Sequence, residues 1–545
     1  MGVKRFEDLQ VYRLAEELAD EIWSLVAPWD WFVKERVGKQ ITRAADSIGA
    51  NIAEGTGRGS FIDNRRFMKI SRGSLYETRH WLRRAYRRAL LTDEQVSRLK
   101  PLLDELAPRL NAYLKSIGPQ PKSQRTKDKR PMTKDKSMTF HHRQLDNGLD
   151  VIAEQNPDAH SVALGLFVNT GSRDEAADVN GVSHFLEHMM FKGSGKYTWE
   201  DVNRIFDEMG AKYNAFTSQE MTAYYANVLP EFTEKAVEHL SHLLRPAIRV
   251  EDFTTEKKVI LEEIAMYLDD PGHRLYEKLM DVHFGNHPLS MSVLGTPQSI
   301  QKLERDQMAE YFARRYGPGN MVLAATGRLE FEQIVDLAQR YCGAWPHVDA
   351  PRNQPDPSYK PQRLALTDPK LSRQYLMGMT PGPSAQDERR FAARVLADVI
   401  GDSDGSRLYW ALVDNAIAEE ADFGFYPHDA CGSFYLALTT SPGRSDEALK
   451  IALGELQKVR SDLNDDEVER AKNKIASSLV LQGEVPLGRM RSIGGQWTYN
   501  RQYRSLEMDM NTLLAITPDS LKNLMRDFPF DPMTLVSLGP GPDGN

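Results

Sequence analysis

A change of hydrophobic pattern across residues 119–137 constrains the fold of this chain more than any other sequence feature. Before it, apolar residues recur every three or four positions, and after it, strand-like and helical segments alternate. The segment itself is polar and basic and has few large apolar side chains, so it buries too little surface to become ordered. We therefore expect a basic flexible linker at residues 119–137 that joins two separately folding parts of the 545-residue chain.

The first part, residues 1–118, has the periodicity of amphipathic helices. Its apolar positions include Leu14, Leu18 and Ile22, which share one helix face. Helix-breaking or capping sequences at residues 28–30, 55–59 and 91–94 divide it into about four helices. Because short connections between long amphipathic helices favour antiparallel neighbours, we predict an all-α four-helix bundle.

Charge is distributed unevenly between the two parts. Residues 1–137 carry 28 lysines and arginines against 18 aspartates and glutamates, whereas the rest of the chain carries 41 against 59. Five arginines of the bundle follow helical spacing: Arg79, Arg83, Arg84, Arg87 and Arg88. With Trp81 and Tyr86 between them, they make RNA a candidate partner, because arginines bind phosphates and aromatic rings stack on bases. A solvated basic face whose aromatic rings point into the bundle is the alternative.

The second part contains the sequence His184-Phe185-Leu186-Glu187-His188. Residues four apart on a helix lie one above the other, so His184 and His188 project from one face with Glu187 beside them. Two imidazoles suit Zn²⁺, and the carboxylate can hold a water at the metal. We predict His184 and His188 as metal ligands and Glu187 as the general base. The identity of the metal rests on the ligand types alone, so manganese and cobalt are alternatives to zinc.

A hydrolytic zinc site needs a third protein ligand and leaves its fourth position to water. The helical stretch 255–266 contains Glu256 and Glu263, which share a face because seven residues make almost two full turns. Glu262 lies about 100° away and is expected in solvent. We predict one zinc ion per chain, with Glu263 as its third ligand and Glu256 orienting a ligand or the water. By itself this stretch would also suit an ordinary charged surface helix.

These residues resemble the motif of the pitrilysin or insulinase class of zinc peptidases, which includes mitochondrial processing peptidase and its bacterial relatives. That class carries HxxEH and, about 75 residues later, a glutamate with another glutamate seven positions before it, as Glu263 and Glu256 stand here. The resemblance covers about residues 139–535. It implies two related α+β halves, each an antiparallel sheet with helices, that face each other across a cavity. It also implies an edge strand that binds substrate at Asn214, Ala215 and Phe216.

On this basis we expect a catalytic half at residues 138–350, an inter-half linker at 351–361 and a non-catalytic half at 362–545. In the second half, residues 391–398 occupy the place of the zinc helix, with Arg394 and Asp398 where histidines would be. Many relatives also carry an Arg and a Tyr seven residues apart, thought to bind substrate, but residues 412–420 contain neither. Another group replaces them, a second subunit supplies them, or activity is weak.

The bundle has a resemblance of its own, to small bacterial four-helix proteins named after intervening sequences in 23S ribosomal RNA genes. The residues that carry it are Phe6-Glu7-Asp8-Leu9 and the segments 50–55 and 71–77. This name records where such genes were found, so the resemblance implies a fold but no activity.

The favoured function is a zinc metalloendopeptidase that hydrolyses peptides or unfolded protein segments, with Glu187 taking the proton of the attacking water. The alternatives are a nucleic-acid-binding or scaffold protein with an inactive peptidase part, and a processing-peptidase subunit that requires a partner. The bundle offers a surface for a homo-oligomer. Because no apolar run approaches about 18 residues and no signal peptide is seen, we expect a cytoplasmic protein without membrane contact. Cys342 and Cys431 are expected to be reduced.

Overall fold

The computed structural model describes residues 6–30, 33–57, 61–88, 90–117, 138–352, 355–403 and 405–541. The chain divides into one unit of residues 1–131 and another of residues 132–545. The predicted linker at residues 119–137 lies outside the described residues. Within the described part of the chain, no helix is both long and apolar enough to span a membrane.

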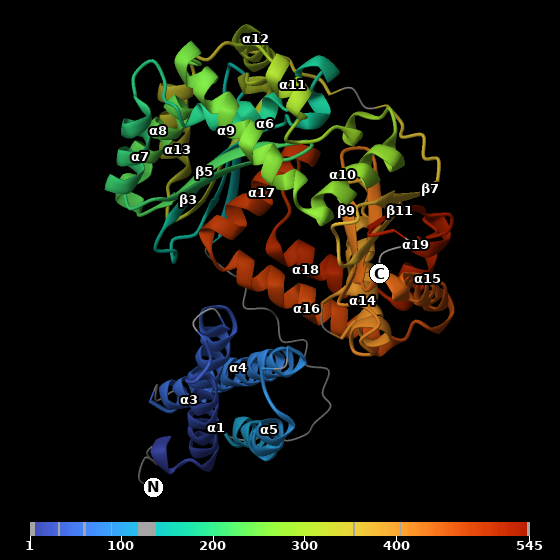
Figure 1. Ribbon diagram of the computed structural model, residues 1–545. Coiled ribbons are helices and arrows are strands. Elements are labelled where there is room, and N and C mark those ends of the chain that lie inside the picture. Colours follow the sequence, from blue (N-terminus) through green and yellow to red (C-terminus); the bar gives the residue numbers. More distant parts are fainter. Residues whose placement is uncertain are drawn as a thin grey trace. The chain divides into compact units, whose positions relative to one another are not determined.

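The first unit is a bundle of four long helices, preceded by a short turn η1 (Phe6–Asp8). The helices are α1 (Gln10–Val26), α3 (Lys39–Gly57), α4 (Phe61–Arg87) and α5 (Asp93–Ser116), with a π-helical turn η2 (Lys34–Gly38) before α3. Each packs against the next, and α5 packs against α1 to close the ring (Figure 1). The core is built from one apolar face of each helix, including Leu18, Ile48, Leu75 and Leu106. The predicted four-helix bundle is confirmed.

The second unit contains two sheets, each with helices packed against it. The first has the order β1-β2-β6-β3-β5-β4 and the second β7-β11-β8-β10-β9. The strands of the first are β1 (Thr139–Gln144), β2 (Asp150–Gln155), β3 (Val162–Val168), β4 (Lys212–Thr217), β5 (Thr222–Val228) and β6 (Met321–Gly327). Those of the second are β7 (Arg363–Thr367), β8 (Gln374–Gly382), β9 (Glu420–Pro427), β10 (Gly432–Thr440) and β11 (Thr534–Gly539).

The two sheets follow the same plan. In each, one parallel pair, β2 with β6 or β7 with β11, is followed by antiparallel strands that end in an edge strand, β4 or β9. The sheets are therefore mostly antiparallel, as expected, but each also contains one parallel pair. The match between the two strand orders confirms the prediction of two related α+β halves.

Helices follow the strands in equivalent places. The helix after β3 is α6 (Val182–Met190), and the helix after β8 is α14 (Arg390–Gly401). The other helices of the first half are α7 (Trp199–Glu208), α8 (Thr233–Leu243), α9 (Val250–Leu268), α10 (Pro271–Phe284), α11 (Pro297–Lys302), α12 (Arg305–Arg315) and α13 (Phe331–Cys342). Those of the second half are α15 (Ser445–Asp462), α16 (Asp465–Gly483), α17 (Pro486–Asn500), α18 (Leu506–Leu514) and α19 (Pro518–Asp527).

Helix α17 ties the halves together, because it comes from the second half but packs against β3 and β6 of the first sheet (Figure 1). Its Met490 and Trp497 are buried against Ile152 and Phe167. Each half also has its own apolar core. Cys342 and Cys431 are buried free thiols, as expected.

A buried charge cluster next to β4 joins the same two halves. Arg173 donates to the Glu220 carboxylate at 2.5 Å, and Glu220 also accepts from the backbone N–H of Asp429 at 3.0 Å and from the Tyr499 hydroxyl at 3.1 Å. Arg352 pairs with Asp429 at 3.0 Å. Glu220 lies in the turn between β4 and β5, so the cluster anchors the end of the edge strand to the second half.

Candidate metal centre

The helix that carries the HxxEH motif is fixed at its start by a buried carboxylate. Glu175 accepts hydrogen bonds from the backbone N–H groups of Gly181 at 2.7 Å and Ser183 at 2.8 Å, so it supplies partners that the first turn of a helix lacks. Burial raises the pKa of Glu175 to about 7 despite these bonds. Gly181 has a φ of +92°, a conformation that favours glycine. The hydroxyl groups of Ser183 and Tyr311 lie 2.7 Å apart and join α6 to α12.

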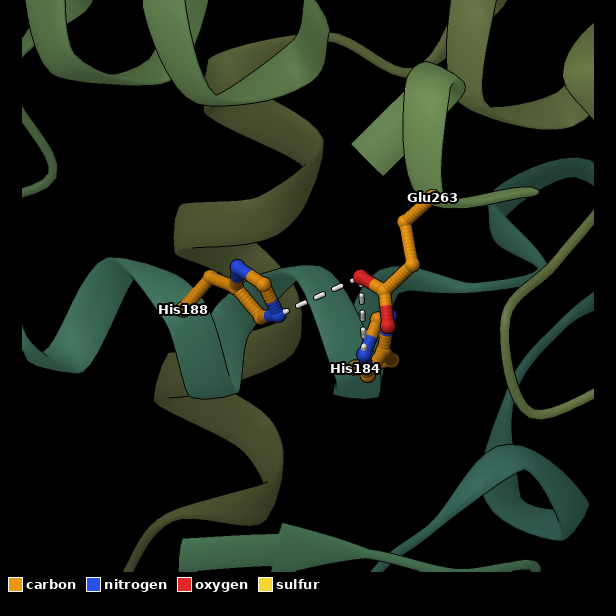
Figure 2. Close-up of side chains that lie close together, drawn as sticks. All are labelled: His184, His188 and Glu263. Carbon is orange, nitrogen blue, oxygen red and sulfur yellow. Dashed lines mark ion pairs between the residues drawn. The ribbon is translucent and has the colours of Figure 1, made fainter. Parts of the chain in front are cut away.

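Three predicted ligands converge at the contact between α6 and α9. Nε2 of His184 lies 3.7 Å and Nε2 of His188 3.6 Å from the same oxygen of Glu263, Oε2. Figure 2 shows both imidazoles on one helix, with the Glu263 carboxylate, which comes from α9, directed at them. Ligand atoms about 2.0–2.2 Å from a tetrahedral ion stand roughly 3.4 Å apart, so these separations are close to those of a zinc site.

The surroundings shift the pKa values of the two imidazoles in opposite directions. Burial, with a smaller contribution from His188, lowers the pKa of His184 to about 4, which favours the neutral ring that can bind a metal. His184 is 8% exposed, and its Nδ1 makes no hydrogen bond within the described residues. Burial also disfavours the charged form of His188, but the neighbouring carboxylates, Glu256 first, outweigh burial and raise its pKa.

Glu256 contacts the ring nitrogen of His188 that faces away from Glu263. Its Oε1 lies 2.9 Å from Nδ1 of His188, and its Oε2 lies 2.5 Å from the Lys192 ammonium. If Nδ1 carries the proton, it donates to Glu256 and leaves Nε2 directed at the metal position. Burial opposes the charged form of Glu256, but His188 and Lys192 outweigh it and lower the pKa of this carboxyl. Nothing in the sequence indicated Lys192.

The predicted general base is held by a residue of the edge strand. The Thr217 hydroxyl donates to Oε2 of Glu187 at 2.6 Å. Burial raises the pKa of Glu187, and the Thr217 hydrogen bond opposes the rise. Nothing in the sequence indicated this role of Thr217, because the alternation of a strand does not reveal which helix its last residue meets. Glu262 is exposed, as expected.

The three predicted substrate-binding residues lie on β4, at the edge of the first sheet. Within the described residues β4 pairs only with β5. Asn214 is exposed, Phe216 is half-buried and Ala215 is buried. The Asn214 side chain accepts a hydrogen bond from the N–H of Ala215 at 2.9 Å. An incoming peptide that paired with this N–H would have to displace that side chain.

The equivalent position in the second half contains no such ligand set. Arg394 is exposed and Asp398 half-buried on α14. Burial raises the pKa of Asp398 to about 6. Across the described part of the chain, His184, His188 and Glu263 form the one group of His, Cys, Asp or Glu residues arranged to hold a metal.

The arginines predicted to contact RNA do not form a uniform surface. The guanidinium of Arg79 donates to the Leu103 carbonyl at 2.7 Å within the bundle. Trp81 packs against the core, whereas Tyr86 is exposed and donates to Asp93 at 2.6 Å. The remaining four side chains are exposed: Arg83, Arg84, Arg87 and Arg88.

Comparisons with known proteins agree with this architecture. The insulinase family (peptidase family M16) matches residues 150–297, the M16 inactive domain matches 302–475, and the 23S rRNA-intervening sequence protein family matches 7–112. An uncharacterized zinc protease of Streptomyces coelicolor is 30% identical over 412 residues, which cover 74% of this chain and 90% of that protein. The zinc protease YmxG of Bacillus subtilis is 28% identical over 401 residues, which cover 72% of this chain and 97% of that protein.

Among solved structures, a protease from Helicobacter pylori superposes with a TM-score of 0.69 at 19% identity, covering 74% of this chain and 99% of that one. An M16 inactive-domain structure from Pseudomonas fluorescens gives a TM-score of 0.69 at 21% identity, covering 74% and 98%. At these identities, the two structures show only that the fold is similar. The sequence match to the Streptomyces protein, in contrast, covers most of that protein's length. The chain therefore belongs to the insulinase family of zinc proteases, peptidase family M16, and carries a module of the 23S rRNA-intervening sequence protein family before its peptidase part.

Proposed function

We propose that this protein is a zinc endopeptidase that hydrolyses peptides or unfolded protein segments. The observation that carries the proposal is the approach of Glu263 to His184 and His188, 3.7 and 3.6 Å away, with Glu187 on the same helix as the histidines. A zinc ion held by these three residues would polarise the scissile carbonyl and acidify a water molecule.

The chain's own residues would complete the reaction. Thr217 holds one carboxylate oxygen of Glu187, which leaves the other to take a proton from the attacking water and return it to the leaving amine. Glu256 would keep the His188 ring in place through Nδ1. A peptide would lie extended along β4 and pair through its backbone, a mode that tolerates many sequences.

A requirement for a second subunit is the main alternative within the same family. Residues 412–420, which lack the Arg and Tyr of many relatives, span the end of the turn η8 (Tyr409–Val413) and the start of β9. If a partner supplies these groups, the purified chain would bind zinc but would not cleave.

Cleavage of a quenched library of unfolded peptides tests the proposal. We would compare the wild type with Glu187→Gln and with Glu262→Gln, a control that removes an exposed carboxylate from the helix that carries Glu263. We expect all three to hold one zinc, and Glu187→Gln to lose roughly 10²- to 10⁴-fold in rate, as expected for a general base. Zinc binding without cleavage by the wild type would contradict an enzyme complete in one chain.

For the bundle we propose RNA contact as a separate activity, supported by the exposed Arg84, Arg87 and Arg88 and by the excess of positive charge on residues 1–137. A gel shift with structured RNA over a salt series tests it, since phosphate contacts make affinity fall steeply with salt. A triple Arg→Gln variant at these positions should lose the shift. An equal shift with the variant would contradict the proposal.

A further inference from the structure

The second half contains a cavity of about 910 Å³ that the proposed mechanism does not use. Its walls come from α14, β9, β10, α16, α17 and α18. Phe423, Gly424 and Phe425 all line it, and consecutive strand residues point to opposite faces, so the cavity lies at the free edge of β9. Its volume is within the range of ligand pockets. It occupies the place that the metal centre has in the first half, because it lies beside the edge strand β9 and helix α14, the counterparts of β4 and α6.

The polar groups of this cavity are mainly cationic. Arg394 makes no ion pair or hydrogen bond with any described residue and is exposed. Arg491 lies over the ring of Tyr225, 4.4 Å from its centroid, and contacts the Tyr225 hydroxyl, a neutral partner that leaves the positive charge uncompensated. By contrast, Asp509 is already paired with Arg504 at 2.7 Å.

Two more charged groups line the cavity and leave the excess of positive charge in place. Arg390 contacts Glu388 at 3.4 Å, a long and partly exposed pair. Asp398 lies one turn after Arg394 on α14, where the charge of Arg394 acts on it, and it is the one carboxylate of the lining that makes no ion pair within the described residues. Of the groups that make no ion pair within the described residues, two guanidinium groups, Arg394 and Arg491, therefore face one carboxylate, Asp398. Apolar side chains provide the rest of the surface: Phe391, Phe423, Phe425, Ile475, Leu479 and Leu513.

Arg491 connects this cavity to the predicted substrate strand. Tyr225, which it contacts, is the cross-strand partner of Asn214 on β4. Directly opposed residues of an antiparallel pair project from the same face of the sheet, so Asn214 and Tyr225 lie side by side. A peptide held along β4 near Asn214 therefore lies close to Tyr225. Arg491 of α17 contacts Tyr225 and also lines the cavity.

We propose that this cavity binds a carboxylate of the peptide substrate, through Arg394 and Arg491, and so selects acidic peptides. The inference rests on the proposed peptidase function, because it takes the peptide on β4 as the ligand. Both an acidic side chain and a free C-terminus carry the required group, and guanidinium groups bind either one through paired hydrogen bonds.

Peptide binding to the Glu187→Gln chain tests the inference without hydrolysis. Fluorescence anisotropy would compare one peptide sequence in three forms: neutral with an amidated C-terminus, neutral with a free C-terminus, and Asp-containing with an amidated C-terminus. We expect one or both carboxylate forms to bind about tenfold more tightly than the neutral amidated form, as expected for a charge-assisted hydrogen bond. The form that binds more tightly identifies the source of the carboxylate.

Arginine substitutions in the same background then locate the site. Arg394→Gln should reduce the preference to less than about twofold, and Arg394→Glu should turn it toward a Lys-containing peptide. Arg526→Gln removes an exposed arginine outside the cavity and should keep the preference. Equal binding of all three peptide forms, or an undiminished preference in Arg394→Gln, would overturn the inference. Selective binding by a wild-type chain that cleaves nothing would contradict the peptidase function alone.

Discussion

Replacing Glu220 with glutamine should destabilise the peptidase unit strongly, because this carboxylate is the centre of the charge cluster that joins the two halves. Burial alone would raise the pKa of Glu220, but His428, Arg352 and Arg173 outweigh burial and lower it to about 2. A fall from the ordinary value of 4.5 to about 2 corresponds to about 3 kcal/mol of stability at neutral pH. The loss of a buried ion pair gives a similar figure, because the substitution leaves the fully buried Arg173 side chain without its counter-ion and such losses cost about 3–5 kcal/mol.

The sign of the pH dependence follows from the lowered pKa. A carboxyl group whose pKa is lower in the folded state stabilises the protein above its unfolded pKa, and this stabilisation is lost as the pH falls toward the folded pKa. The difference in unfolding free energy between wild type and Glu220→Gln should therefore be about 3 kcal/mol at pH 7 and about 1 kcal/mol smaller at pH 3.5. Urea unfolding followed by fluorescence at both pH values measures this difference.

A second glutamate provides the control. Glu332 pairs with Arg143 through two hydrogen bonds, but both side chains are exposed, and exposed ion pairs contribute little to stability. Glu332→Gln should leave the unfolding midpoint almost unchanged. If Glu220→Gln is no more destabilising than Glu332→Gln, or if its effect does not diminish on acidification, the cluster does not stabilise the junction as inferred.

Three further predictions concern the site and the division of the chain. Thr217→Val should lower kcat by roughly ten- to a hundredfold with unchanged zinc content, because it removes the hydrogen bond to the Glu187 carboxyl group. Steady-state kinetics and metal analysis measure both quantities, and an unchanged kcat would contradict the role of Thr217. Glu256→Gln should weaken zinc binding by about 10- to 100-fold in competition with a chromophoric chelator, whereas an unchanged affinity would show that Glu256 does not support His188. Residues 138–545 alone should fold and bind zinc, because the bundle has its own core, and loss of cooperative thermal unfolding in this fragment would contradict two independent units.

Local pattern was sufficient to predict the part of the site that lies on single helices. The four-residue spacing of His184 and His188 and the seven-residue spacing of Glu256 and Glu263 set which side chains share a face, and the structure brings His184, His188 and Glu263 together. The three- and four-residue periodicity of residues 1–118 likewise predicted the four-helix bundle. These features depend on residues a few positions apart, where helix and strand geometry is regular.

Long-range contacts account for what could not be predicted. Thr217 meets Glu187 across 30 positions and Arg173 meets Glu220 across 47, and no periodicity relates such pairs. The placement of β6 between β2 and β3 follows from tertiary packing, so the alternation of elements does not reveal it. The packing of α17 against the first sheet was also missed, because its apolar residues are compatible with burial in either half.

X-ray absorption spectroscopy of the purified chain, with zinc counted by mass spectrometry, tests the central claim most directly. The account predicts one zinc per chain, with two imidazole nitrogens and a carboxylate oxygen at about 2.0–2.2 Å, and a loss of zinc affinity in Glu263→Gln but not in Glu262→Gln. A chain without zinc, a spectrum with sulfur ligands at about 2.3 Å, or full zinc binding by Glu263→Gln would contradict the account.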